Sequence, residues 1–291
     1  MATYAAPSLF QPHRARQALR DAKDGKIPPL MVCYLGLSSI PTARFIAPFG
    51  FDAVWIDWEH TACNVETMTT MVHDISFMSG GRSIPFVRVP GHDHAAIGYA
   101  LDAGASIVIP QIETVAQAQH VLSASKFGTR QRGTRSAPPF RLIPGITDAR
   151  AVHPHLDVWQ NLNEQAAVMI QIETLEGIRN LDAILTAVPD IDAVWLGTLD
   201  ARISMNLPAG FGVPDDEPEW VEAVRLYEET MEKHGKVKGG FVLGGEPETI
   251  RAAARDKEFL CGFADVLALM GMAGSLGQAR AALAEVGGDK K

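Results

Sequence analysis

Two acidic residues each follow a short apolar run in this 291-residue sequence. Glu173 comes shortly after the run 166–170, and Asp200 comes shortly after the run 191–196. Each run has the length of one buried strand, so we expect both carboxylates at the carboxyl end of a parallel strand, where α/β proteins place their chemistry. Two oxygen ligands at this position could form a binding site for a hard divalent cation. The sequence therefore predicts a metal site built on this pair.

Two further strand ends add acid–base groups to the same edge. The second expected strand ends with Asp57, Glu59 and His60, and the third ends with Arg88. A cation held by two carboxylates keeps positions for substrate oxygens, which a 2-oxo acid can fill with its carboxylate and keto oxygens. The cation would then act as a Lewis acid that favours an enolate, and Arg88 would stabilise the enolate oxygen. His60, or a water that the cation polarises, would move the proton.

Each of these residues also has a simpler interpretation. Glu173 or Asp200, taken alone, would only cap the following helix, and His60 would be an ordinary polar loop residue. Arg88 would close a salt bridge at the rim. Because side chains alternate along an extended segment, a turn after Asp57 would send only one acid of that segment into the site. Taken together, the residues favour the metal site.

Two other features admit both a functional and a structural interpretation. Asp102 lies near the end of an expected helix, just before Ala103-Gly104, where the helix dipole disfavours a negative charge. A residue that breaks a local rule is a functional candidate, although exposed helix ends tolerate an acid at small cost. The pairs Gly239-Gly240 and Gly244-Gly245 hint at phosphate binding, but tight turns explain them more simply.

The elements that must position these residues alternate between short apolar strands and helix-length segments. Near-continuous apolar strands are typical of a parallel sheet that is buried on both faces. Eight such units in about 250 residues favour an α/β protein with a (β/α)8 TIM barrel, one domain over residues 1–291, rather than an open doubly wound sheet. The expected strands are 30–35, 53–56, 84–89, 106–110, 167–172, 193–197, 237–243 and 266–270.

Capping residues mark the helices between these strands. Asn64 is an expected N-cap, with Gly80-Gly81 at the end of its helix, and Asp93 is another, with Gly104 as the stop. The expected helices are 65–78, 94–103, 175–186, 219–234 and 247–255.

Two segments do not follow this alternation of strands and helices. They are the N-terminal segment 1–28 and the loop 127–160 between the fourth and fifth strands. A loop this long in a compact domain is usually a functional lid, an interface or disordered. Its arginines predict contact with an anionic substrate or a neighbouring subunit, or else a solvated loop; they are Arg130, Arg132, Arg135, Arg141 and Arg150.

Composition and charge narrow the class of function. Hydrophobic residues make up 47% of the chain and charged residues 21%, as in an ordinary globular enzyme. A net charge of −8 without a basic run argues against a nucleic-acid partner. Cys33, Cys63 and Cys261 lack the spacing of a zinc site or a disulfide frame. We find no signal-peptide pattern and no apolar run of membrane-spanning length, so we expect a cytoplasmic protein with no membrane partner.

Six segments, in family order, resemble the HpcH/HpaI aldolase/citrate lyase family, the class II 2-oxo-acid aldolases of the phosphoenolpyruvate/pyruvate-binding barrel superfamily. The resemblance spans residues 15–280, and segments 133–136 and 144–148 are similar to a fungal member that decarboxylates oxaloacetate and adds the enolate to a 2-pyrone. The six are Leu35-Gly36-Leu37-Ser38, Ile56-Asp57-Trp58-Glu59-His60, Val87-Arg88-Val89-Pro90, Leu101-Asp102-Ala103-Gly104-Ala105, Ile109-Pro110-Gln111-Ile112-Glu113-Thr114 and Gln171-Ile172-Glu173-Thr174.

Carried over residue by residue, the resemblance implies a catalytic role for the matching positions. Glu173 and Asp200 would ligate a divalent metal, Mg²⁺ in the first place, with Mn²⁺ or Co²⁺ as alternatives. Arg88 would contact the keto or enolate oxygen. His60, oriented by Asp102, would handle the proton.

The resemblance also implies contacts with water and substrate. Asp57 would hold a water on the metal, Gln171 would border the pyruvyl pocket, and Tyr34 would contact the substrate. Thr198 and Leu199 would line the same pocket, at a position where the family usually has Gly-Pro-x-Asp.

The chain departs from the family pattern at several positions close to these residues. Thr198 replaces the proline, and the bulky Leu199 follows it. Thr61 follows the histidine where the family favours Gly or Ala, and Trp58 replaces a smaller residue. These changes would shift Asp200 or narrow the pocket.

The resemblance implies a carbon–carbon lyase, a divalent-metal-dependent class II aldolase that makes or cleaves C–C bonds of 2-oxo acids through a pyruvate enolate. Oxaloacetate decarboxylation reaches the same enolate. The partners would be pyruvate or oxaloacetate and an aldehyde or other electrophilic acceptor. One alternative is an enzyme of secondary metabolism that adds the enolate to a larger cyclic acceptor, and another is a barrel that binds 2-oxo acids but has lost turnover.

The resemblance further implies a homo-oligomer, a trimer of dimers in which subunits exchange their last helix. The apolar C-terminal segment 266–283 is compatible with that exchange.

Overall fold

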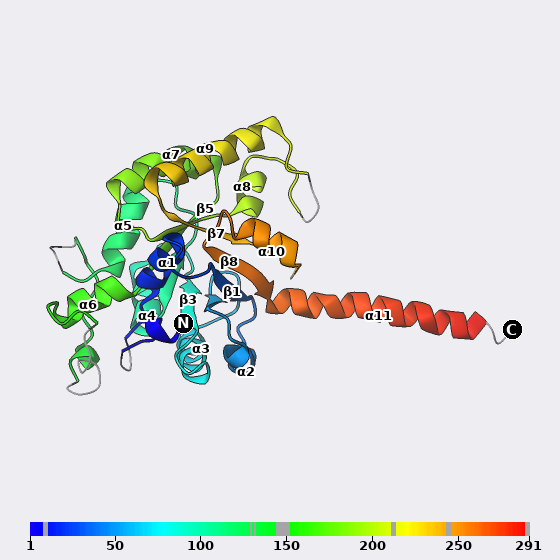
Figure 1. Cartoon of the computed structure of the whole chain (residues 1–291), viewed down its shortest axis with the longest axis horizontal. Helices are drawn as coiled ribbons and strands as arrows, with labels where there is room; N and C mark the ends of the chain where they lie inside the picture. Colours follow the sequence, from blue (N-terminus) through cyan, green and yellow to red (C-terminus); the bar gives the residue numbers. More distant parts are fainter. Residues whose placement is uncertain are drawn as a thin grey trace.

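Eight parallel strands close into a barrel in chain order, and helices surround it (Figure 1). The computed structural model describes residues 1–7, 11–128, 130, 132–143, 152–210, 214–242 and 246–288. The strands are β1 (Leu30–Leu35), β2 (Ala53–Asp57), β3 (Ile84–Arg88), β4 (Ser106–Ile109), β5 (Val168–Ile172), β6 (Ala193–Leu196), β7 (Val237–Phe241) and β8 (Phe259–Ala264). Because β8 pairs with β1, the ring is closed, and the predicted (β/α)8 fold is confirmed.

Helices lie outside the barrel, and all except α11 pack around it. They are α1 (Ala15–Lys23), α2 (Ile40–Ile46), α3 (Val65–Met78), α4 (His94–Asp102), α5 (Val115–Ser125), α6 (Val158–Gln165), α7 (Leu175–Ala187), α8 (Thr198–Ser204), α9 (Pro218–His234), α10 (Pro247–Ala253) and α11 (Asp265–Gly288). Short 3-10 turns occupy Ala2–Tyr4, Ala47–Phe49 and Pro139–Leu142. The two N-caps predicted from the sequence are confirmed, because Asn64 accepts the N–H of Thr67 and Asp93 accepts that of Ala96.

Two hydrophobic layers hold the barrel together. Residues of one parity along each strand fill the barrel interior, among them Trp55, Phe86 and Phe259, and those of the other parity, such as Val54, pack under the helices. Gly239 belongs to the inner layer, where a Cβ atom would lie 2.7 Å from the Trp195 ring. The glycine pair of β7 therefore serves packing inside a strand.

Gly240 confirms that packing role, because a Cβ there would lie 2.8 Å from the Lys257 side chain. The pair is neither a phosphate loop nor a tight turn. Gly244-Gly245, together with 144–148 and Arg150, lies outside the described residues.

The predicted eighth strand, 266–270, is wrong. The eighth strand is β8, and residues 266–270 lie in the first turns of α11. A short apolar run fits a buried strand and a helix equally well, because its hydrophobicity has no distinctive period. The loop 127–160 is also shorter than predicted, since Asp157 forms a capping box with Gln160 and begins α6.

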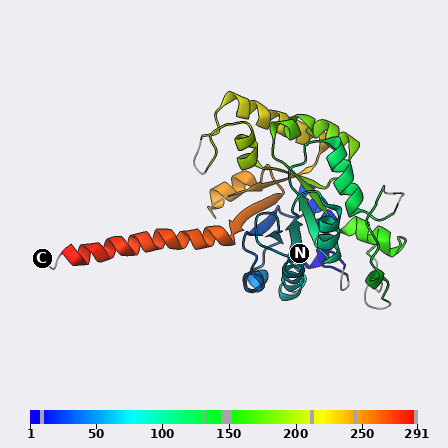
Figure 2. The ribbon, with the colours of Figure 1, turned by 180° about the vertical axis from the view of Figure 1, so that it is seen from behind.

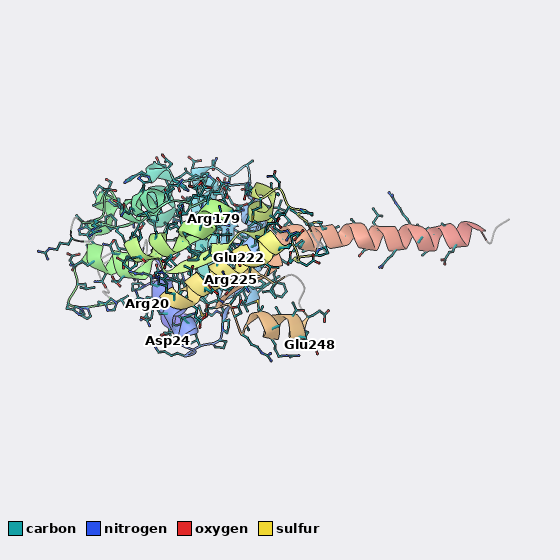
Figure 3. All side chains as sticks on the ribbon, turned by 90° about the horizontal axis from the view of Figure 1, so that it is seen from above. Arg20, Asp24, Arg179, Glu222, Arg225 and Glu248 are labelled. Carbon is teal, nitrogen blue, oxygen red and sulfur yellow. The ribbon has the colours of Figure 1, made fainter. Side chains whose placement is uncertain are left out.

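Helix α11 leaves the barrel after β8 and projects as a single long helix (Figures 1 and 2). Seen from above, it extends away from the barrel, and only its first residues lie close to β1 and β8 (Figure 3). Its apolar side chains are exposed, with Leu269 at 53%, Met272 at 65% and Leu276 at 53%. By length and composition alone, residues 265–285 could cross a membrane, so the expectation that no segment meets this test is wrong.

The segment 11–13 lies across the amino end of the barrel. The Gln11 carbonyl lies close to Gly104, which precedes β4, and Gln165, which precedes β5, donates to the Pro12 carbonyl. His13 is 2% exposed, and its Nε2 lies 3.1 Å from the Gly81 carbonyl, before β3. The N-terminal segment therefore closes the base of the barrel.

His13 makes the stability of the protein depend on pH. Burial lowers the pKa of His13 to about 4, although the hydrogen bond to Gly81 acts in the opposite direction. The unfolded chain takes up the proton first, so the stabilisation is complete above pH 6.5 and is lost as the pH falls from 6.5 towards 4. We expect the free energy of unfolding to fall by about 2 kcal/mol from this residue between pH 7 and pH 5.

Urea titrations at both pH values measure this contribution. The His13→Gln variant removes the titrating ring, so its free energy of unfolding should change less between pH 7 and pH 5 than that of the wild type. An equal change in the two proteins would contradict the assignment to His13.

Candidate active site

Glu173 stands where the barrel interior opens at the carboxyl end of β5. It is 4% exposed. Its Oε2 accepts the backbone N–H of Gln111 at 2.9 Å, and its Oε1 accepts Nε2 of Gln171 at 3.0 Å. Gln111 has a left-handed backbone (φ 51°), which is uncommon for a residue other than glycine. The loop after β4 and the end of β5 thus hold this carboxylate in place.

The Glu173 carboxyl group lies among like charges. Burial raises its pKa to about 7; the Gln111 N–H acts in the opposite direction, and Asp200 and Glu59 add to the rise. Burial also raises the pKa of Glu59, in spite of the charge of Arg88. The three carboxylates of Glu173, Asp200 and Glu59 therefore repel one another, and a cation bound there would relieve this repulsion.

Gly197 provides the space that the Glu173 carboxylate occupies. A Cβ atom at Gly197 would lie 2.6 Å from both Cγ and Oε1 of Glu173. Any larger residue at the end of β6 would displace the acid.

Asp200 reaches the same cavity from the first turn of α8, which begins at Thr198 directly after Gly197. Thr198 and Leu199 also line this cavity. The altered turn therefore keeps Asp200 on the side of Glu173, and Leu199 adds an apolar group, 55% exposed, to the rim.

Arg88 is fixed at the end of β3 by Asp57 at the end of β2. Its Nε donates to Asp57 Oδ1 and its Nη2 to Oδ2, both at 2.9 Å. Burial acts to raise the pKa of Asp57, but the hydrogen bonds and charge of Arg88 outweigh it and keep that pKa below its ordinary value. This bidentate pair of hydrogen bonds fixes the orientation of the guanidinium.

Tyr34 completes this network from β1. Its hydroxyl donates to Asp57 Oδ2 at 2.6 Å and accepts from Arg88 Nη2 at 3.2 Å. Tyr34, Arg88 and Gln171 line the cavity, whereas Asp57 lies behind Arg88 and is 1% exposed. The structure thus places Tyr34 and Asp57 where they position Arg88.

A turn does follow Asp57, but both acids of the segment reach Arg88. The Asp57 carboxylate accepts the N–H of Glu59, and Thr61 Oγ1 donates to the Asp57 carbonyl at 2.7 Å. Glu59 Oε2 nevertheless lies 3.2 Å from Arg88 Nε. The turn directs Glu59 towards the guanidinium, whereas Asp57 stays buried behind Arg88.

The two departures in this segment have local explanations. Thr61 stabilises the turn through its hydroxyl. The Trp58 indole donates to the Cys63 carbonyl at 2.7 Å and packs against the outer hydrophobic layer, so Trp58 does not narrow the cavity.

His60 lies on the cavity wall, and its side chain is 64% exposed. Its Nε2 is 3.5 Å from Glu59 Oε2. A histidine in this position can exchange protons between the cavity and solvent.

The expectation that Asp102 orients His60 is not met within one chain. Asp102 ends α4, which runs back to the amino end of the barrel, whereas His60 follows β2 at the carboxyl end. Asp102 instead accepts Arg135 Nη2 at 2.6 Å. An arginine of the loop 127–160 thus compensates the acid that the helix dipole disfavours.

Glu173 and Asp200 are the residues best placed to hold a cation. No three His, Cys, Asp or Glu side chains in the part of the chain that the structure describes are grouped as a complete ligand set. A metal here would therefore take its other oxygens from substrate and water, as Mg²⁺ commonly does. The like charge around the buried Glu173 fits such an ion.

Sequence patterns missed the roles of two residues of this site and one contact. Glu59 was expected as a strand-end acid, but its contact with Arg88 depends on the turn after Asp57. Gln111 acts through its backbone N–H, which no side-chain pattern reveals. Gly197 acts through the side chain that it lacks, and only its place before Asp200 could have drawn attention to it.

The space at Gly197 yields a direct test. We expect Gly197→Ala to displace Glu173, to lower the free energy of unfolding by about 1–3 kcal/mol and to weaken binding of Mn²⁺, measured by calorimetric titration. Gly98→Ala on α4 is the matched control, because a Cβ there meets nothing within 4 Å. Equal Mn²⁺ affinity in the two variants would contradict the assigned role of Gly197.

Comparisons with known proteins identify the family of this chain. The model of the HpcH/HpaI aldolase/citrate lyase family matches residues 30–216. The chain is 31% identical over 217 residues to a 4-hydroxy-2-oxo-heptane-1,7-dioate aldolase of Shigella sonnei (strain Ss046), which covers 72% of this chain and 75% of that protein.

Solved structures give the same result. The structure of macrophomate synthase superposes with a TM-score of 0.88 at 32% identity and covers 98% of this chain and 95% of that one. A family protein from Burkholderia cenocepacia J2315 shares the fold, with a TM-score of 0.76 at 24% identity over 91% of this chain and 98% of that one. The chain therefore belongs to the HpcH/HpaI aldolase/citrate lyase family, whose members are carbon–carbon lyases.

Proposed function

We propose that this chain is a divalent-metal-dependent lyase that makes or cleaves a C–C bond of a 2-oxo acid through a pyruvate enolate. One observation carries the proposal: the buried Glu173 shares the barrel mouth with Asp200 and Glu59, directly beside Arg88. Such a surplus of carboxylates is suited to a cation, and the guanidinium is suited to an anionic substrate.

Glu173 and Asp200 would hold the cation, Mg²⁺ in the first place and Mn²⁺ or Co²⁺ as alternatives. When bound, it would act as a Lewis acid that stabilises negative charge on the oxygens of a 2-oxo acid. Gln171 keeps Glu173 in position through Nε2, and its buried Oε1 has no hydrogen-bond partner. That orphaned oxygen supports a ligand or water at this point in the cavity.

Arg88 would stabilise the charge that develops on the substrate oxygen. Its Nε and Nη2 face Asp57, and no acceptor among the described residues engages its Nη1. This third nitrogen remains for an oxygen in the cavity. Because Asp57 and Tyr34 fix the guanidinium before substrate binds, little reorganisation is needed during reaction.

His60 would carry the proton between the methyl carbon of pyruvate and solvent. In the direction of synthesis it accepts this proton, and the C–H bonding electrons become the enolate. Oxaloacetate reaches the same enolate when the bond to its leaving carboxylate breaks and CO₂ departs, a step that needs no base.

A second candidate function is addition of the enolate to a larger cyclic acceptor, as in secondary metabolism. The similarity to macrophomate synthase, which extends over 98% of this chain, favours it. A barrel that only binds 2-oxo acids is the third candidate, motivated by Thr198 and Leu199. The position of Asp200 in the same cavity as Glu173 supports the two catalytic candidates.

We also propose that α11 pairs with a second copy of the chain. Leu269, Met272, Leu276, Ala279 and Leu283 repeat at intervals of three and four residues, which is the spacing of a helix–helix seam. An isolated helix with these exposed apolar side chains is marginal in water. Pairing or exchange between subunits would bury them and give a homo-oligomer, with a trimer of dimers as the specific expectation.

Exchange of the pyruvate methyl protons in D₂O, followed by NMR, tests the enolate chemistry. We expect exchange that requires Mg²⁺ or Mn²⁺ and that falls at least about 100-fold in Glu173→Gln or Arg88→Lys. Glu173→Gln keeps the shape of the side chain but removes its charge. Arg88→Lys keeps the positive charge but removes the planar guanidinium that forms bidentate hydrogen bonds.

Exchange that persists after removal of metal by EDTA would contradict the metal-dependent mechanism. Binding of pyruvate without exchange would support the candidate that has lost turnover. Oxaloacetate decarboxylation, measured on the same variants, should fall in parallel, because it reaches the same enolate.

The role of α11 is tested by light scattering after size-exclusion chromatography. We expect Leu269→Glu combined with Leu276→Glu to reduce the particle mass, because charges on the seam cannot be buried. Gln278→Glu with Ala281→Glu adds the same charge on the opposite face and should leave the mass unchanged. A wild-type monomer that binds phosphatidylcholine vesicles would instead indicate a membrane-seeking helix and contradict pairing.

A further inference from the structure

The cavity that contains Glu173 and Asp200 is larger than a three-carbon 2-oxo acid requires. Its volume is about 800 Å³, within the range of pockets that enclose drug-sized ligands. It extends past the end of β7 to Trp220 and Val224 of α9. The part beyond the two carboxylates is therefore open to a second reactant.

Apolar side chains border this second part. Phe241, at the end of β7, packs edge-on against Trp195 and Tyr34, with ring centroids 4.9 and 6.0 Å apart. One half of Phe241 remains exposed, as does Leu199 on the rim. Large apolar groups that stay uncovered inside a concave site favour an apolar ligand.

The cations of this part of the cavity are already neutralised. Lys238 Nζ donates to Glu228 at 2.6 Å and also binds Asp256. Lys257 Nζ donates to the other oxygen of Asp256. Among the described lining residues, the other permanent cation is Arg88, which lies at the 2-oxo-acid end of the cavity.

These observations disfavour an anionic acceptor. A carboxylate on the second reactant would find no free cation among the described residues that line this part of the cavity, and it would approach the like charges of Glu59, Glu173 and Asp200. An unpaired charge brought out of water is costly. An uncharged reactant would instead gain contact with Leu199 and Phe241.

We propose that this part of the cavity is an acceptor subsite for an uncharged, apolar carbonyl compound, with Leu199 and Phe241 as its specificity-determining residues. The proposal rests on the proposed function, since it concerns the second reactant of the same enolate. In the step itself, the enolate carbon bonds to the acceptor carbonyl carbon, and the acceptor carbonyl oxygen gains a proton. No oxidant or reductant is needed.

Two four-carbon aldehydes test the subsite because they differ mainly in charge. The full-length protein with Mg²⁺ and pyruvate is assayed with butanal and with 4-oxobutanoate, and kcat/KM is measured for each. We expect butanal to be preferred by at least about tenfold. Preference for 4-oxobutanoate would overturn the proposal.

Substitutions at Leu199 test its role in the specificity of the acceptor subsite. Leu199→Arg supplies the missing cation, so the butanal/4-oxobutanoate ratio should fall by at least about tenfold relative to Leu199→Gln, the matched uncharged variant. Leu199 is on an exposed rim, and a ratio of two acceptors cancels any general loss of enolate formation. Equal ratios in the two variants would overturn the role of Leu199.

Phe241→Ala should lower kcat/KM for butanal more than for 4-oxobutanoate, because only butanal gains from the apolar contact. An equal loss for both aldehydes would overturn the role of Phe241. Proton exchange of pyruvate separates the two proposals. Absence of exchange in the wild type would refute the proposed function, whereas exchange with the wrong aldehyde preference would refute only the acceptor subsite.

Discussion

Like charge confined at the mouth of the barrel is the constraint on which the site depends. Glu173 is buried close to Asp200 and Glu59, and the charge of Arg88 is shared between Asp57 and Glu59. Such crowding destabilises the folded protein unless a cation or substrate compensates it. The barrel tolerates it because the closed ring of strands fixes each acid where a ligand can reach it.

The rest of the fold supports this arrangement from two directions. Aromatic rings fill the interior below the site, and the N-terminal segment around His13 closes the base. Above, loops supply what strands cannot, namely the N–H of Gln111 and the space at Gly197. The C-terminal helix differs from the rest, since α11 leaves the barrel with its apolar side chains exposed.

The two halves of the cavity carry different chemistry. The inner half is charged and held by hydrogen bonds, as expected for a group that binds a small 2-oxo acid. The outer half is lined by Leu199, Phe241 and Trp195, and its lysines are engaged by acids. Members of one family can share the first half and differ in the second, because loops and helix termini build the second half.

The sequence by itself determined the barrel, the metal-ligand candidates and Arg88, because strand burial and strand-end acids are local patterns. It mistook the start of α11 for the eighth strand, since short apolar runs have no distinctive period. Only the tertiary structure showed that Asp102 pairs with Arg135 at the other end of the barrel and that Glu59 bends back to Arg88. These contacts depend on turns and helix directions, which place residues far apart in sequence side by side.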